Sequence, residues 1–203
     1  MSTRDRQKTA PGTQLKAKGF SAVELVVAMA VVLIITGVAM PSITSNLRVY
    51  QLNSTAGMVA DQFKSSRFDA IRRNIIQTCF ITPVAGGYQL WTDAKGTGAW
   101  VNTDHTTLLV RSVSLVPAGS VPIAGQLASA MGVTGTTAIS GSGAQVSLNF
   151  DQRGAVNGNN QVNVLYIGYP NNPTWGYRAV VILPSGSVQV WSPNGSGGWN
   201  QVN

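Results

Sequence analysis

An apolar segment near the N-terminus restricts the fold of this 203-residue chain more than any other feature. The stretch Leu25–Met40 is apolar apart from one threonine and one glycine. As a helix, the segment Phe20–Met40 would be about 31 Å long, which is enough to cross a bilayer. Residues 1–19 carry five basic residues and one acidic residue, and a basic flank stays in the cytoplasm. The sequence therefore predicts a membrane span with the rest of the chain on the far side.

Three interpretations fit this segment. It could be a Sec signal peptide with Gly37-Val38-Ala39 as the cleavage site, or a plain signal anchor. The third interpretation starts from Glu24, because a carboxylate within an apolar span costs about 2–3 kcal/mol or more. Such a group either reaches the interface or has a partner. A free amine made by cleavage before Phe20, on a neighbouring copy of the chain, would be such a partner.

The residues around Glu24 resemble a known processing signal. The run Lys18-Gly19-Phe20-Ser21-Ala22-Val23-Glu24-Leu25 is similar to the class III signal of type IV prepilins and type II secretion pseudopilins. In that family a membrane peptidase cuts between Gly and Phe and methylates the new amine. The resemblance implies that Gly19 ends a cleaved leader (residues 1–19), that Phe20 becomes the methylated N-terminus and that Glu24 assists assembly. The leader is longer than is usual in the family.

Helical periodicity continues beyond the apolar segment (residues 20–41). Five residues fall within about 60° of one another on a helical wheel: Leu52, Ala56, Val59, Phe63 and Ala70. We expect this stripe to face a core, in an amphipathic segment over residues 42–76 whose helix ends at Arg73 or Asn74. Pro41 should kink the helix rather than end it, and it matches the helix-kinking proline common in the pilin family.

Residues 77–203 have the short alternating runs and turn residues of a β-rich domain. The candidate strands are Thr78–Thr82, Tyr88–Thr92, Leu108–Val116, Gln145–Phe150, Gln161–Ile167, Tyr177–Leu183 and Ser187–Trp191. Pro184-Ser185-Gly186-Ser187 predicts a hairpin turn. Residues 117–144 are rich in Gly, Ala, Ser and Thr and predict a long loop with a short strand at Val121–Ile123.

Two segments of this β-rich part resemble the GspH/FimT subfamily of minor pilins and pseudopilins. Arg67 to Asn74, followed by Thr78-Cys79-Phe80, is similar to the end of the long helix and the first strand. Leu148 to Gly154, and Tyr177 to Gly186, are similar to a later strand with its turn and to the final hairpin. The resemblance implies an α+β, pilin-like fold, in which a long kinked N-terminal helix packs on an antiparallel sheet.

The composition gives little support for an enzyme. The chain has one cysteine, Cys79, which we expect to pack as a small apolar side chain, and one histidine, His105, in a predicted loop. No Gly-x-Ser-x-Gly motif is present, and Asp93, Asp104 and Asp151 have no metal-loop spacing. We therefore expect no catalysis, no metal and no cofactor. Among the five tryptophans, Trp199 is a candidate for an exposed partner contact.

Nucleic-acid binding is not expected either. The formal charge is +7, but residues 1–19 contribute +4 of it. Lys64, Arg67, Arg72 and Arg73 point in different directions on the helical wheel, as on a solvated surface. Some FimT-like minor pilins bind DNA and share a Gly-Arg-x-Arg segment, where this chain has Gly186-Ser187-Val188-Gln189. Few phosphate contacts remain, so affinity for DNA would be low.

The resemblance implies a minor pseudopilin of a type II secretion system. Such a subunit is anchored once in the bacterial inner membrane, with its N-terminus cytoplasmic and its head periplasmic, and joins a periplasmic filament. Its partners would be the prepilin peptidase, other pseudopilins and the inner-membrane assembly platform. A minor pilin of a type IV pilus is the first alternative. The second is a Sec-secreted β-domain binding protein, which predicts no helix across residues 42–74.

Overall fold

The computed structural model describes residues 19–109, 112–139, 144–158 and 160–202. The predicted leader, apart from Gly19, lies outside these residues, as do positions 140–143 of the predicted loop. The chain divides into two compact units, Met1–Thr44 and Ser45–Asn203. We describe each unit by itself and call the second one the head.

A single long helix, α1 (Ala22–Arg73), contributes to both units. Its first backbone bond runs from the Leu25 N–H to the Ser21 carbonyl, at 3.1 Å. The helix is continuous through Pro41, so this proline does not end it; the kink stays a prediction. Because α1 continues to Arg73, the predicted helix end is confirmed. The alternative of a Sec-secreted β-domain protein predicts no helix across residues 42–74, and this prediction is wrong.

The C-terminal end of α1 is closed by a Schellman motif. Asn74 has a positive φ of 54°, a conformation that asparagine tolerates better than most residues. The Asn74 N–H donates to the Ile71 carbonyl, and the Ile75 N–H donates to the Ala70 carbonyl, each at 3.2 Å. These two bonds satisfy helix carbonyls that would otherwise lack a partner and turn the chain into the first strand.

The head contains two sheets. The first has the order β3-β2-β1-β6-β7 and the second has the order β11-β10-β9-β8-β4, with β5 also paired to β8. The first sheet consists of β1 (Gln77–Val84), β2 (Gly87–Thr92), β3 (Thr106–Leu109), β6 (Val146–Phe150) and β7 (Val156–Asn157). The second consists of β4 (Ser114–Val116), β5 (Thr136–Ala138), β8 (Val162–Gly168), β9 (Tyr177–Ile182), β10 (Val188–Pro193) and β11 (Trp199–Val202). All pairs are antiparallel except β5 with β8. The α+β architecture implied by the resemblance is therefore confirmed, with two sheets in the head.

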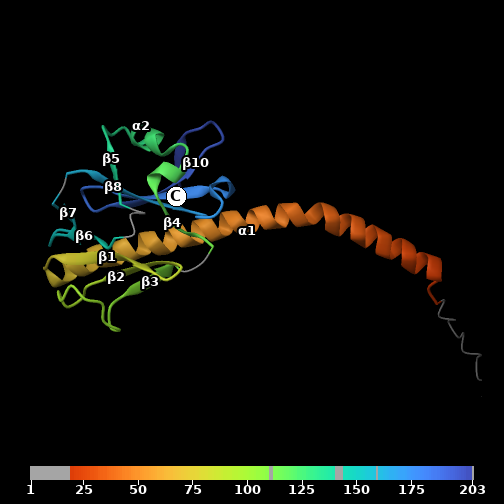
Figure 1. Ribbon diagram of the computed structural model, residues 1–203, viewed down its shortest axis with the longest axis horizontal. Helices are drawn as coiled ribbons and strands as arrows, with labels where there is room; N and C mark the ends of the chain where they lie inside the picture. Colours follow the sequence, from red (N-terminus) through yellow and green to blue (C-terminus); the bar gives the residue numbers. More distant parts are fainter. Residues whose placement is uncertain (1–18, 110–111, 140–143, 159, 203) are drawn as a thin grey trace, which may run out of the picture. The chain divides into compact units, whose positions relative to one another are not determined.

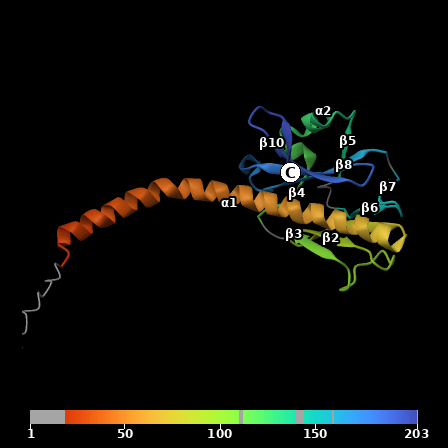
Figure 2. The ribbon, with the colours of Figure 1, turned by 180° about the vertical axis from the view of Figure 1, so that it is seen from behind.

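The main core lies between the head part of α1 and both sheets. The predicted stripe of α1 is fully buried there: Leu52, Ala56, Val59, Phe63 and Ala70. It shares one cluster with first-sheet residues such as Ile81 and Phe150 and with second-sheet residues such as Leu165 and Val180. In Figure 1, β2 and β3 of the first sheet lie on one side of the yellow end of α1 and β8 and β10 of the second sheet lie on the other, and the reverse view in Figure 2 agrees.

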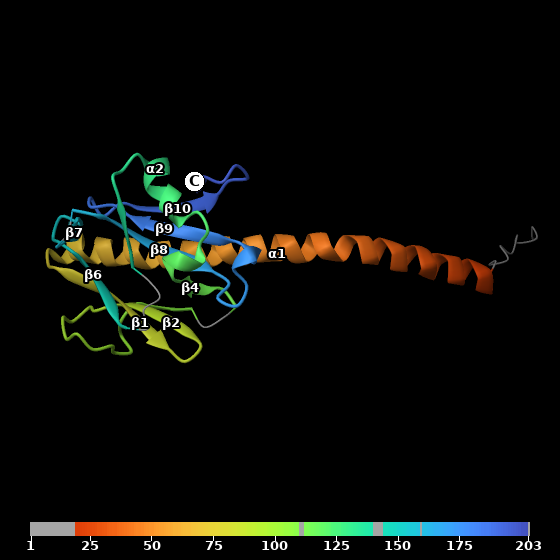
Figure 3. The ribbon, with the colours of Figure 1, turned by 45° about the horizontal axis from the view of Figure 1, so that its top comes forward.

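Two predictions for the middle of the head are wrong. The single strand expected over Leu108–Val116 is two strands, β3 in the first sheet and β4 in the second. The segment 117–144 is not one long loop, and Val121–Ile123 is not a strand. Its described part holds two 3-10 turns (Ala118–Ser120 and Ala124–Gln126), the short helix α2 (Leu127–Met131) and β5. A third 3-10 turn, Pro173–Trp175, precedes β9. Figure 3 shows α2 in the head close to β10, and β5 pairs with β8.

A second, smaller core explains why the described part of this segment, residues 117–139, folds. Leu127 of α2 is fully buried, in one cluster with Val164, Tyr166 and Val181 of the second sheet. Trp199 joins the same cluster with 4% of its surface exposed, and its indole N–H donates to the Ile123 carbonyl at 2.8 Å. The predicted exposed partner contact at Trp199 is therefore wrong, because this side chain fills the core between β11 and the 117–139 segment.

Candidate assembly site

The predicted processing residues lie directly before α1. Gly19, Phe20 and Ser21 precede the first helical residue, and all three are exposed. The Phe20 side chain is 80% exposed. A Cβ placed on Gly19 would meet no atom within 4 Å. The glycine is therefore not required by packing within the described residues, and a requirement for it would come from another molecule.

Glu24 lies in the first turn of α1. An acidic group at a helix N-terminus interacts favourably with the helix dipole. The side chain is exposed, and its carboxylate makes no hydrogen bond or ion pair with any other described residue. Glu24 is therefore positioned to accept a cationic partner.

The rest of the first unit presents apolar side chains in all directions around the helix. Every residue from Gly19 to Met40 is exposed. Helix α1 is long and apolar enough to cross a membrane, and none of its apolar window is buried. The Thr36 hydroxyl donates to the Val32 carbonyl at 2.8 Å, so this polar group is satisfied within the helix. Such a surface is stable only in lipid or against other apolar helices, and Glu24 is its one charged group.

The basic residues of the helix are held by contacts within the head. Arg72 pairs with Asp69 at 2.8 Å, Lys64 pairs with Asp61 at 3.2 Å, and Arg73 donates to the Ala94 carbonyl at 2.9 Å. Arg67 is predicted to lie on a solvated surface, but its side chain is half-buried. Its Nε donates to the Gly154 carbonyl at 3.1 Å. These contacts give the cations structural partners within the head.

Arg67 also lies where two glycines meet. A Cβ on Gly186 would lie 1.7 Å from the Gly154 carbonyl oxygen, and both glycines have φ near +80°. The subfamily-like segments Leu148 to Gly154 and Tyr177 to Gly186 therefore converge on Arg67 at the end of α1. Their spacing in the sequence gave no sign of this contact.

Two of the aspartates that lack metal-loop spacing are brought to one loop. Asp93 and Asp104 are buried, and their carboxylates accept backbone N–H bonds from residues between them. Asp93 accepts from Lys95, Thr97 and Gly98, and Asp104 accepts from Ala94 and Val101. These carboxylates organise the loop. No metal-ligating group of three or more residues is found among the described residues, and His105 is exposed.

A buried polar cluster joins α1 to the first sheet. The Gln62 amide donates to the Thr92 hydroxyl and to the His105 carbonyl, each at 2.9 Å, and the Thr107 hydroxyl donates to the Gln62 amide oxygen. Burial raises the pKa of the neighbouring Cys79 thiol from 9.0 to about 12. A thiol with such a pKa stays protonated and unreactive at neutral pH. The predicted packing role of Cys79 agrees with this environment.

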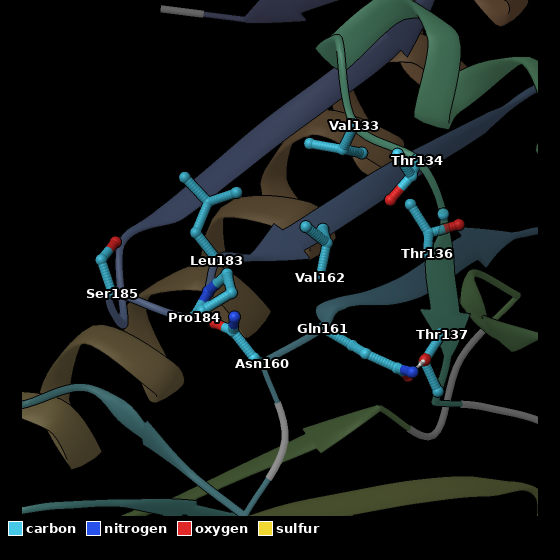
Figure 4. A pocket seen from close by; sticks show the side chains of 11 residues that line it. Val133, Thr134, Thr136, Thr137, Asn160, Gln161, Val162, Leu183, Pro184 and Ser185 are labelled. Atoms are coloured by element: carbon cyan, nitrogen blue, oxygen red, sulfur yellow. Dashed lines mark hydrogen bonds between the residues drawn. The ribbon is translucent and has the colours of Figure 1, made fainter.

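A hollow of the head lies elsewhere, between β5 and the β9–β10 turn. Figure 4 shows its rim, with Thr136 and Thr137 on one side and Pro184 and Ser185 on the other. Its volume is about 770 Å³, and none of its described lining residues is charged or a histidine. Its polar lining consists of hydroxyl and amide side chains, such as those of Thr136, Ser185 and Gln161.

The comparisons with known proteins identify one similar fold. No protein-family model matches the chain, and no curated protein matches it. Among solved structures, the chain is similar to the crystal structure of the type IV minor pilin FimU of Pseudomonas aeruginosa. The TM-score is 0.46 and the sequence identity is 15%, over 76% of this chain and 94% of that one. The functional residues are therefore assigned from the chain's own sequence and geometry.

Proposed function

We propose that the chain is a membrane-anchored structural subunit of a pilin-like filament. The observation that carries the proposal is Glu24, an exposed carboxylate without a described partner on an otherwise apolar, exposed helix. A charge in this position has an energetic cost in lipid. Pairing with a cation removes much of that cost, so Glu24 favours a state in which another chain supplies the cation.

The proposed mechanism needs no chemistry from the subunit itself. A prepilin peptidase cleaves between Gly19 and Phe20 and methylates the new Phe20 amine. Before assembly, the apolar N-terminal part of α1 holds the subunit in the bilayer. During assembly, Glu24 pairs with the Phe20 amine of an adjacent subunit, and the apolar side chains of α1 exchange lipid for neighbouring helices. The inner-membrane assembly platform acts on this anchored form.

Within this class, we propose a minor pseudopilin of a type II secretion system. The head would lie in the periplasm and the filament would help export folded proteins. A minor pilin of a type IV pilus is the alternative, because the processing signal and the fold class are shared. The neighbouring genes separate the two: a secretion ATPase and secretin favour the first, and twitching-motility genes favour the second.

The test of this proposal is the replacement of Glu24. In cells that carry the complete system, we expect Glu24→Ala to leave the chain processed and the head folded, but to reduce its amount in the filament at least tenfold. The matched control is Asp61→Ala, which removes an exposed acid from the head part of the same helix and should leave incorporation unchanged. Gly19→Ala should block processing. Normal incorporation of Glu24→Ala would overturn the mechanism.

A further inference from the structure

The C-terminal end of α1 carries a second apolar surface that the membrane segment does not explain. Four large apolar residues are exposed within nine positions: Phe68, Ile71, Ile75 and Ile76. Phe68 is 73% exposed and Ile76 is 56% exposed. Single exposed apolar residues are common on protein surfaces, but a concentration of them marks an interaction site. We call these four residues the helix-end patch.

The local geometry places the patch residues close together. Phe68 and Ile71 are three positions apart on α1, so they are neighbours on one helix face. The Schellman motif turns Ile75 back toward the last helical turn, through its bond to the Ala70 carbonyl. Ile76 follows directly and precedes the buried Gln77 of β1. The patch is therefore one surface at the junction of α1 and β1.

Four arginines belong to the segments that form or adjoin this patch. Arg72 and Arg73 lie in the last turn of α1, and Arg67 lies beside Gly154, where an added Cβ would be 2.7 Å from the Ile71 side chain. Arg153 precedes that glycine, and its side chain makes no hydrogen bond or ion pair with the described residues. These four arginines outnumber the two acidic residues of the same segments, Asp69, which pairs with Arg72, and Asp151, so the rim of the patch has a positive balance of charge.

The acidic residues of this chain cannot complement that rim. The chain has seven acidic residues in total, and five of them are in the head. Asp93 and Asp104 are buried, and Asp61 and Asp69 are paired with Lys64 and Arg72. The Asp151 carboxylate accepts two backbone N–H bonds. A second copy of this head would therefore meet the patch with a surface of the wrong charge.

We propose that the helix-end patch docks a different protein subunit of the same filament, through an apolar surface of that subunit with acidic residues at its edge. Apolar burial would supply affinity, and the opposite charges at the edge would select the partner. A nucleic acid would leave the four apolar side chains without a partner. The inference rests on the proposed filament function and names a partner surface for the head.

Site-specific photocrosslinking in cells with the complete system tests the inference. We would introduce p-benzoylphenylalanine at Phe68, irradiate the cells, and identify crosslinked chains by mass spectrometry. The control is the same replacement at Leu108, an exposed apolar residue of β3 that lies outside the patch. We expect position 68, and not position 108, to crosslink to one other pilin-like chain. Arg153→Glu should lower that yield about fivefold, because it reverses a charge at the edge of the interface.

The outcomes separate this inference from the proposed function. If the chain is in the filament fraction but position 68 crosslinks only to lipid, to a second copy of this chain or to nothing, the docking inference is wrong and the filament function stands. An unchanged crosslinking yield with Arg153→Glu would also overturn the inference that the partner has acidic residues at the edge of the interface. If the chain is absent from the filament fraction, both proposals fail together.

Discussion

At the scale of single residues, the contact between Gly154 and Gly186 sets a strict limit on sequence. The two subfamily-like segments cross here with no room for a side chain, and Arg67 from α1 binds the same carbonyl group. Each glycine is already favoured by its positive φ, and the close approach of the two backbones adds a second requirement. This second requirement comes from a residue more than thirty positions away, so it could not be predicted from local turn chemistry.

Replacement of Gly186 should destabilise the head strongly. The Cβ in Gly186→Ala would lie 1.7 Å from the Gly154 oxygen at a φ of +76°, and we expect a loss of about 3 kcal/mol or more in the free energy of unfolding. The control is Gly195→Ala, where an added Cβ meets nothing within 4 Å. Thermal unfolding of the full chain in detergent measures both, and equal melting temperatures would contradict the prediction.

The buried thiol predicts a specific pH dependence. The pKa of Cys79 is raised from 9.0 to about 12 by burial, so between these values the folded state binds more protons than the unfolded state. The contribution of Cys79 to stability is therefore fully present below pH 9 and is lost as the pH rises toward 12. Urea unfolding at pH 8 and pH 11 should show a larger decline for the natural chain than for Cys79→Ala. An equal decline would show that the thiol is not buried.

At the scale of elements, α1 was the most predictable part of the head. The stripe from Leu52 to Ala70 indicated both the helix and its buried face, because helical periodicity is a local property of the sequence. Strand assignment was less complete. The run Leu108–Val116 alternates as one strand would, but its two ends join different sheets, and this choice depends on partners that are distant in sequence. The burial of Trp199 was missed for the same reason.

The Schellman motif at the end of α1 can be tested by two opposite substitutions. Asn74 has a φ of 54°, which a β-branched residue adopts only at a cost. We expect Asn74→Val to lose about 1–2 kcal/mol of unfolding free energy, whereas Asn74→Gly should be neutral or slightly stabilising. Chemical unfolding of both variants provides the measurement. A glycine variant as unstable as the valine variant would mean that the asparagine side chain, and not the backbone, supports the motif.

At the scale of the whole molecule, the assignment as a filament subunit depends on how the N-terminus is processed. The resemblance that motivates it was found in eight residues, Lys18 to Leu25, and could be recognised from the sequence alone. The structure adds that Gly19 and Glu24 have no packing role within the described residues. Their importance is therefore expected to be intermolecular, which no single-chain structure could reveal.

The first measurement at this scale is the N-terminal residue and intact mass of the native protein from membranes. We expect a chain that starts at Phe20 and is heavier by one methyl group. The Gly19→Ala variant is the control and should keep its leader. A chain that starts at Met40 would instead indicate signal-peptide cleavage after Ala39, and an uncut chain would indicate a plain anchor.

The position of Trp199 has a consequence for how the head is made. Helix α1 leaves the ribosome before any strand, yet the second core stays open until β11 places this indole between Ile123, Tyr166 and Tyr177. During synthesis, a partly made head therefore exposes aromatic surface until β11 has emerged. A chain that stops before Trp199 would be a substrate for quality-control proteases rather than a smaller working subunit.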